Sequence, residues 1–263
     1  MNKLLCILLF SIVTGCASVE HKTEGTTFDA PKFNNNTLQV IKPWESGPHP
    51  TVIVGHGCDG LKKNPALLDW ARELNSWGYN AVFYDSFESK GVSGGIVCTQ
   101  HIESVSPTFR AKEAEIAANW IKEQPWHKGK IGYIGESHGG STAIRISKDA
   151  NSESNISALV AFYPACDSQQ IGSITLNKEN STPYFGQFMN IPTQLHLAGA
   201  DDWTPSHACK QIQHADIFEY AGATHSFDLI YPDRKMFGHT LKYDKKATAL
   251  SRERVKKFLS ENL

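Results

Sequence analysis

The chain has no excess of charge of either sign: its 263 residues include 26 Lys and Arg and 27 Asp and Glu, for a formal net charge of −1. Such a balance gives no support to nucleic acid or an anionic membrane surface as a partner. The chain also lacks internal repeats and low-complexity blocks, which excludes a repeat architecture. Its glycine, proline and charge content is that of an ordinary soluble globular protein.

Long apolar runs are missing as well. The most apolar stretch, residues 4–13, holds about ten residues and is too short to span a bilayer. It ends in Val13-Thr14-Gly15-Cys16, which resembles the bacterial lipobox, where the cysteine becomes lipidated. That resemblance implies a lipoprotein signal peptide over residues 1–16, a lipid anchor at Cys16 and a place in the bacterial cell envelope. The alternative is an ordinary cleaved signal peptide with an incidental cysteine.

The rest of the chain divides into a tether and one domain. Residues 17–35 are polar with little apolar periodicity, which predicts a flexible tether, and residues 36–263 suit a single domain. Strand-like and amphipathic segments alternate in that domain, which predicts an α/β fold with a mostly parallel central sheet and helices on both faces. The expected strands are 37–41, 50–55, 80–84, 130–134, 158–163, 193–197 and 216–220, and the expected helices include 65–77, 109–121 and 247–259.

Two loops, 86–107 and 167–189, are longer than a connection requires. Long irregular loops in compact domains usually form lids or binding surfaces. Both loops follow the carboxyl ends of expected strands, where open parallel sheets bind ligands. We therefore expect binding surfaces there, with two solvated excursions as the plainer alternative.

Four cysteines lie in the expected domain, beside Cys6 in the leader and the proposed anchor. An even number in an exported chain predicts two disulfides, and the sequence leaves all three pairings open. A metal site that combines cysteines with His56 and His101 is a weaker alternative, because the chain has no C-x-x-C pair. We expect no metal. The four candidates are Cys58, Cys98, Cys166 and Cys209.

A candidate nucleophile stands in Gly135-Glu136-Ser137-His138-Gly139, which follows an expected strand. In a G-x-S-x-G elbow the chain turns sharply from a strand into a helix and exposes the serine hydroxyl. A second match, Gly91-Val92-Ser93-Gly94-Gly95, follows no strand and reads as a flexible loop. We therefore take Ser137 as the nucleophile and Ser93 as a chance match.

A nucleophilic serine needs a base and an acid that orients it, in the chain order Ser, Asp or Glu, His. Asp201 and Asp202 stand in a turn after an expected strand, and His225 follows the last expected strand. The spacing leaves one helix and one strand between acid and base. We predict a triad of Ser137, Asp201 and His225, with Asp202 as the alternative acid.

The oxyanion that forms in acyl transfer needs two backbone N–H donors. We assign one to His138, which follows the nucleophile, and the other to Cys58, in the glycine-rich turn after an expected strand. An unremarkable turn is the alternative for the second. His56 is expected to shape that turn rather than act as a base. The aromatic residues Trp203, Phe87 and Tyr163 either line the cleft or pack in the core.

Together these segments resemble the dienelactone hydrolase family of α/β-hydrolases. The resemblance implies the α/β-hydrolase fold over nearly the whole domain, acyl-transfer chemistry, and Asp201 as the triad acid, since it stands four residues before Pro205. One departure matters: the family's founding enzymes carry a cysteine at the elbow, so the dienelactone substrate does not carry over to Ser137. The segments that resemble the family are 54–61, 84–87, 162–164 with Cys166, and 201–205 with Cys209.

We therefore expect a lipid-anchored serine hydrolase of carboxylic esters that acts on a small-molecule substrate through an acyl-enzyme intermediate. It needs no metal or organic cofactor, and it meets the membrane through its N-terminal lipid only. Two alternatives remain open: an amidase or peptidase with the same triad, and a non-catalytic envelope lipoprotein that keeps the fold to bind a ligand.

Overall fold

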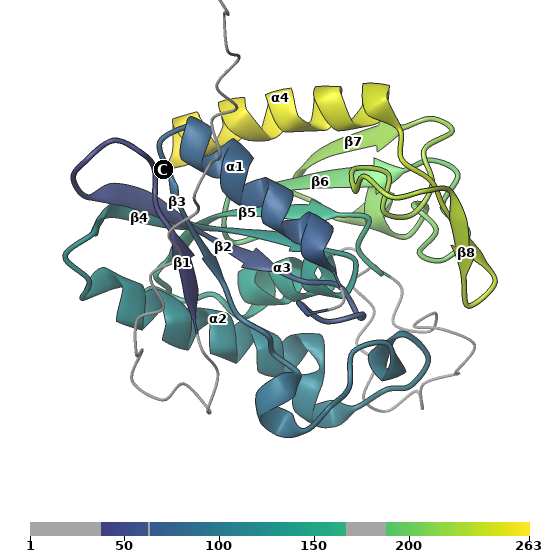
Figure 1. The fold of residues 1–263 in the computed structure, drawn as a ribbon, viewed down its shortest axis with the longest axis horizontal. Coiled ribbons are helices and arrows are strands. Elements are labelled where there is room, and N and C mark those ends of the chain that lie inside the picture. The colour runs from purple at the N-terminus through teal and green to yellow at the C-terminus, as the bar shows by residue number, and fades with distance from the viewer. Residues whose placement is uncertain (1–37, 63, 167–187) are drawn as a thin grey trace, which may run out of the picture.

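The computed structural model describes residues 38–62, 64–166 and 188–263. Its central sheet has the strand order β1-β3-β2-β4-β5-β6-β7, and every neighbouring pair is parallel except β1 with β3. The expected α/β architecture with a mostly parallel sheet is confirmed (Figure 1). The strands are β1 (Gln39–Ile41), β2 (His49–Gly55), β3 (Asn80–Phe83), β4 (His127–Glu136), β5 (Ile156–Phe162), β6 (Thr193–Ala198) and β7 (Asp216–Tyr220).

Helices cover both faces of the sheet. One face packs against α1 and α4, and the other against α2 and α3. Figure 1 shows α4 along the top of the molecule and α2 at the lower left, with the sheet between them. The helices are α1 (Asp69–Ser76), α2 (Pro107–Lys122), α3 (His138–Asp149) and α4 (Lys245–Asn262).

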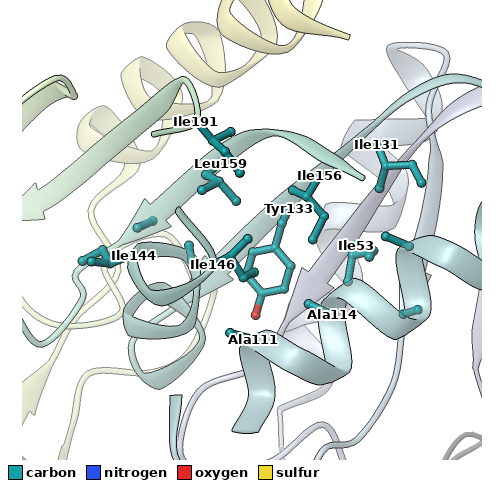
Figure 2. Close-up of a cluster of buried hydrophobic side chains, with 14 of the residues drawn as sticks. Ile53, Ala111, Ala114, Ile131, Tyr133, Ile144, Ile146, Ile156, Leu159 and Ile191 are labelled. Carbon is teal, nitrogen blue, oxygen red and sulfur yellow. The ribbon is translucent and has the colours of Figure 1, made fainter. Parts of the chain in front are cut away.

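The apolar residues of β2 belong to two hydrophobic cores, one on each face of the sheet. Successive side chains of a strand point to opposite faces. Val52 therefore joins the core that contains Trp70 of α1, while Ile53 joins the core that contains Ala114 of α2. Figure 2 shows this second core, in which the small side chains of α2 lie near the ring of Tyr133. All these side chains are buried, so both faces of the sheet are covered.

The ends of two helices follow from single residues. α2 begins at Pro107, whose missing N–H costs nothing in the first turn of a helix. α4 begins after Asp244, whose carboxylate accepts hydrogen bonds from the backbone N–H groups of Lys246 and Ala247, both at 2.9 Å.

The expected strands are found within about two to three residues at each end, as is usual for element boundaries. Two expectations on the remaining elements were wrong, and one element was not foreseen. The helix expected from residue 65 starts as a 3-10 turn, Pro65–Leu68, before α1. Between Asp201 and His225 lies a 3-10 turn, Cys209–Gln211, instead of a helix, because the backbone becomes extended at Ile212 (φ −69°, ψ 133°) and ends the turn. A hairpin of β8 (Arg234–Met236) and β9 (His239–Leu241) was not expected.

The four domain cysteines form two disulfides, Cys58–Cys98 and Cys166–Cys209. The expectation of two disulfides is confirmed, and the pairing that the sequence left open is settled. These sulfurs are bonded to each other, so the alternative of a cysteine-containing metal site is excluded for them. Among the described residues, no group of three or more His, Cys, Asp or Glu side chains is arranged to hold a metal ion.

Several expectations concern residues outside the described part of the chain. They are the signal peptide over residues 1–16 with Cys16, the tether over 17–35, and most of the loop 167–189. These stay predictions. In the described residues, no helix combines the length and apolar character that crossing a membrane requires.

Candidate active site

Ser137 stands at the sharp turn between β4 and α3. Its backbone has φ 52° and ψ −113°, a conformation that non-glycine residues rarely adopt and that is concentrated at functional sites. The turn is held from behind, because the N–H of Ser137 donates to the carbonyl of Phe162 on β5 at 2.9 Å. The chain therefore holds this serine in a strained position at the carboxyl edge of the sheet.

The glycines on both sides of Ser137 are required by close backbone packing. A Cβ on Gly135 would lie 2.0 Å from the carbonyl oxygen of Gly139, and a Cβ on Gly139 would lie 2.3 Å from the carbonyl oxygen of Gly55. No side chain fits at either distance. The G-x-S-x-G spacing is therefore a steric consequence of packing the first turn of α3 against the end of β2.

The structure brings Ser137, His225 and Asp201 into one hydrogen-bond chain. Oγ of Ser137 lies 3.0 Å from Nε2 of His225, and Nδ1 of His225 lies 2.7 Å from Oδ2 of Asp201. A carboxylate only accepts hydrogen bonds, so the proton sits on Nδ1 of His225 and leaves Nε2 free to accept from the serine hydroxyl. This is the tautomer that a general base for Ser137 requires.

Asp201 is held as a carboxylate by its surroundings. Burial opposes its charge, but His225 and the backbone N–H groups of Thr204 and Trp203 outweigh burial and lower the pKa of Asp201 below its ordinary value. Oδ1 accepts from the N–H of Trp203 at 2.8 Å and of Thr204 at 2.9 Å, and Oδ2 accepts from the Thr204 hydroxyl at 2.9 Å. Both oxygens are thus oriented by the turn that follows β6.

The neighbouring carboxylate points elsewhere. Asp202 accepts a hydrogen bond from the N–H of Thr240 at 3.1 Å and lies 3.6 Å from Nδ1 of His239, both on the β8–β9 hairpin. Asp201 is therefore the member of the pair that reaches His225, and Asp202 fastens the hairpin to the turn after β6.

The two segments proposed to supply oxyanion donors meet at Ser137. His138 is the first residue of α3, so its N–H has no acceptor within the helix. Gly57 and Cys58, in the turn after β2, line the same pocket as Ser137. A Cβ on Gly57 would lie 3.6 Å from Cβ of Ser137, which shows how closely this turn approaches the nucleophile.

The side chains of His56 and His138 are buried behind this turn and stay neutral. Nε2 of His56 accepts from the N–H of Ser86 at 3.0 Å, and its Nδ1 lies 2.7 Å from the carbonyl oxygen of Gly57. Burial and the nearby Arg110 lower the pKa of His56 to about 3. The structure places His56 as a brace of the turn, as expected, and not beside Ser137 as a base.

The pocket over Ser137 contains residues that the sequence did not single out. Burial raises the pKa of Asp59 to about 6, and burial raises the pKa of Glu136 well above its ordinary range. Of the expected aromatic residues, Trp203 and Tyr163 line the pocket, whereas Phe87 packs in a small core with Val97 and Val105. The further lining residues not foreseen are Asn64, Ser226, Leu229, Arg234, Met236 and Leu241.

A signal for some of these residues was present in the sequence. Asp59 follows Cys58 directly and Glu136 directly precedes Ser137, so their position beside expected site residues could have marked them. Arg234 and Met236 come from β8, which the sequence did not reveal.

Ser93, the second motif match, lacks the partners of a nucleophile. It is exposed in a surface groove lined by Asp59, Asp85 and Glu88, and within the described part of the chain its Oγ bonds only to the carbonyl of the adjacent Gly94, at 3.5 Å. No histidine among the described residues bonds to it.

Comparison with known proteins yields a family and a shared fold. A family model described as "Dienelactone hydrolase family" matches residues 37–263. A search of curated proteins finds no significant match.

Solved structures resemble the chain at low identity. A Klebsiella pneumoniae protein named as a dienelactone hydrolase is 17% identical with a TM-score of 0.66, over 86% of this chain and 92% of that one. Est1E from Butyrivibrio proteoclasticus, solved with ferulic acid, is 17% identical with a TM-score of 0.61, over 86% and 95%. Dipeptidyl peptidase 4 from Porphyromonas gingivalis is 21% identical with a TM-score of 0.62, over 87% of this chain but 34% of that one. The family match and the shared fold agree: the chain belongs to the dienelactone hydrolase family of α/β-hydrolases and is a hydrolase.

Proposed function

We propose that the protein is a serine hydrolase that cleaves carboxylic esters through an acyl-enzyme intermediate. The observation that carries the proposal is the hydrogen-bond chain from Ser137 through His225 to Asp201, at 3.0 Å and 2.7 Å. Each member is fixed by a different part of the fold: the elbow after β4, the loop after β7 and the turn after β6.

The reaction follows from the positions of the protons. As Oγ of Ser137 attacks the ester carbonyl carbon, its proton passes to Nε2 of His225, and Asp201 stabilises the imidazolium that results. The tetrahedral intermediate collapses, and the leaving alcohol takes the proton from His225. Water then gives a proton to Nε2 of His225 as it attacks the acyl carbonyl carbon. The second tetrahedral intermediate collapses, Oγ of Ser137 takes the proton back from His225, and the carboxylic acid leaves.

The amides of Cys58 and His138 are proposed to hold the oxyanion. Their support is positional: one belongs to the turn that approaches Ser137, and the other is an N–H at the start of α3, where the helix dipole also favours negative charge. Neither side chain takes part, since Cys58 is in a disulfide and the His138 ring is buried.

The space over Ser137 favours a small acyl group. The enclosed part of the pocket has a volume of about 20 Å³, enough for about one water. We propose that short-chain esters are better substrates than long-chain ones, because the space enclosed by these lining residues is small.

An amidase or peptidase with the same triad is the alternative function, and the likeness to dipeptidyl peptidase 4 is the observation that favours it. That likeness covers only 34% of the peptidase chain, and the family match concerns a hydrolase family named for a lactone. A non-catalytic binding lipoprotein is less well supported, because a binding module has no chemical need for an ordered base and acid beside a strained serine.

The cellular setting is also a proposal. Two disulfides favour an oxidising compartment such as the bacterial periplasm or the cell surface. Together with the lipobox-like segment ending in Cys16, they support an exported protein anchored to the envelope by lipid.

A matched panel of substrates tests the function. Protein without residues 1–16 is assayed on p-nitrophenyl acetate, butyrate and octanoate and on aminoacyl p-nitroanilides. We expect hydrolysis of the esters, fastest for acetate, and a loss of about 10⁴-fold or more in Ser137→Ala. Anilides cleaved faster than every ester would support the amidase, and no turnover of any substrate would support the binding lipoprotein.

A further inference from the structure

Arg110, in the first turn of α2, is a buried cation, and its burial lowers the free energy of unfolding. Its side chain is 2% exposed, and its Nε is buried with no hydrogen-bond partner among the described residues. Arg110 forms no ion pair in the part of the chain that the structure describes. The carboxylate of Glu113, one turn further along the same helix, pairs with Lys90. Burying a charge without a counter-ion is unfavourable, so packing alone gives little reason for an arginine here.

The two terminal nitrogens of Arg110 reach two different segments. One donates to Nδ1 of His138 at 2.7 Å, and the other donates to the carbonyl oxygen of His56 at 2.8 Å. His138 is the residue after the nucleophile, and His56 stands two residues before Cys58. One planar guanidinium therefore joins the two segments whose amides face the oxyanion in the proposed function.

These two segments also touch each other directly. A Cβ on Gly139 would lie 2.8 Å from the carbonyl oxygen of His56, the same oxygen that Arg110 binds. The turn after β2 and the start of α3 are therefore closely packed, and Arg110 binds both of them from the side of α2. The Phe87 ring, 5.4 Å from the guanidinium carbon, packs against the group.

Arg110 also fixes the state of the His138 ring. A guanidinium only donates, so Nδ1 of His138 accepts and its proton sits on Nε2. Burial and the charge of Arg110 lower the pKa of His138 well below its ordinary value, and the ring stays neutral. The positive charge behind the two amides is thus carried by Arg110, where it favours a negative oxyanion.

We infer that Arg110 is a positioning residue of the oxyanion hole: it holds the amides of Cys58 and His138 at the separation that the tetrahedral intermediate requires. The inference rests on the proposed serine hydrolase function. It concerns the transition state, so removing Arg110 lowers kcat more than it changes KM.

The test compares Arg110→Met, Arg110→Lys and the control Glu113→Gln, a buried position one turn along α2 that pairs with Lys90 and, among the described residues, has no hydrogen bond or ion pair to either segment. For each protein, a fluorophosphonate carried to completion counts the reactive sites. The kcat and KM for p-nitrophenyl acetate and the Ki of a trifluoromethyl ketone, which forms a tetrahedral adduct with serine, are then measured per site.

In Arg110→Met we expect kcat per site to fall by about 10-fold to 100-fold, less than the loss of a whole oxyanion donor, with KM changed by less than about threefold. The Ki of the ketone rises by a similar factor, because the adduct needs the same amides. Arg110→Lys recovers part of the rate, since an ammonium keeps the charge but reaches only one segment well. Glu113→Gln keeps the wild-type kcat and Ki.

Normal kcat and Ki per site in Arg110→Met would overturn the inference, even if fewer sites were reactive, because that pattern marks a role in stability alone. If Arg110→Met does not fold, Arg110→Lys decides: unchanged kcat and Ki per site overturn the inference. A wild-type protein that hydrolyses no ester would instead refute the proposed function, and the role of Arg110 would fall with it.

Discussion

Nδ1 of His225 lies 2.7 Å from Oδ2 of Asp201, while the adjacent Asp202 contacts the β8–β9 hairpin. Successive residues of a turn direct their side chains differently, so only one of the pair reaches the imidazole. The turn holds Asp201 with two backbone N–H groups and leaves the Asp202 side chain about half exposed. The two carboxylates therefore have separate tasks, although they are neighbours in the chain.

Substitution of the two aspartates should separate these tasks. Asp201→Asn should lower kcat for p-nitrophenyl acetate by about 10³-fold to 10⁴-fold, because an amide no longer fixes the tautomer of His225 or stabilises its charged form. Asp202→Asn is the matched control and should keep kcat within about threefold. Equal losses in the two variants, or the larger loss in Asp202→Asn, would show that the acid is assigned wrongly.

The two disulfides should differ in their effect on catalysis. They close loops with sequence separations of 40 and 43 residues, so removing either should cost about 4 kcal/mol by the loop-closure estimate. The double variant of Cys58 and Cys98 to serine should also lower kcat, because this disulfide holds the turn that is proposed to supply an oxyanion amide. The corresponding variant of Cys166 and Cys209 should keep its kcat below its melting temperature. Urea unfolding and initial rates measure both effects, and equal kcat in the two variants would argue against an oxyanion role for the Cys58 turn.

Gly139, the last glycine of the G-x-S-x-G elbow, should tolerate no side chain. In Gly139→Ala the new methyl group meets the carbonyl oxygen of Gly55 at 2.3 Å, so the start of α3 must move and Ser137 with it. We expect no soluble active protein, or a kcat reduced by about 100-fold or more. Gly222→Ala is the control: it has φ +79° but nothing within 4 Å of the new Cβ, so it should cost about 1 kcal/mol and leave kcat unchanged. Wild-type activity in Gly139→Ala would contradict the packing described for the elbow.

Asp59 should make stability depend on pH in a defined direction. Burial raises its pKa from 3.8 to about 6, so the folded protein holds this proton more tightly than the unfolded chain. Its contribution to stability therefore falls as the pH rises from 3.8 to about 6 and stays lost above that.

Asp59→Asn should consequently be more resistant to urea than the wild type at pH 7.5, with the difference shrinking toward pH 4. Asp233→Asn, at an exposed position paired with Lys242, controls for the loss of one negative charge. A difference between Asp59→Asn and the wild type that is the same at both pH values would contradict the assignment.

The sequence was most informative where local pattern and tertiary role coincide. The β-branched run of residues 50–55 predicted β2 because a strand covered on both faces is apolar along its whole length. The β8–β9 hairpin was missed because neither of its short strands alternates apolar with polar residues. Tertiary contacts with the turn after β6 position the hairpin. One of them is the stacking of the His239 ring on the Trp203 ring, with 4.9 Å between the centroids.

The candidate site shows the same division. Chain order was enough to select Ser137, His225 and the turn with the two candidate acids, because each follows a strand of one parallel sheet and the carboxyl ends of such strands share an edge. The choice of Asp201 over Asp202 came from the family resemblance. Disulfide pairing could not be derived, since four cysteines allow three pairings whatever the spacing. The role inferred for Arg110 was also out of reach, because an arginine in an amphipathic helix normally points to solvent.

Covalent labelling tests the central claim most directly. Protein without residues 1–16 is treated with a fluorophosphonate probe and the modified residue is identified by mass spectrometry, in wild type, Ser137→Ala and Ser93→Ala. We predict one probe per molecule, attached to Ser137, with labelling abolished in Ser137→Ala and unchanged in Ser93→Ala. Labelling that persists in Ser137→Ala, or a wild type that does not react, would contradict the assignment of Ser137 as the activated nucleophile.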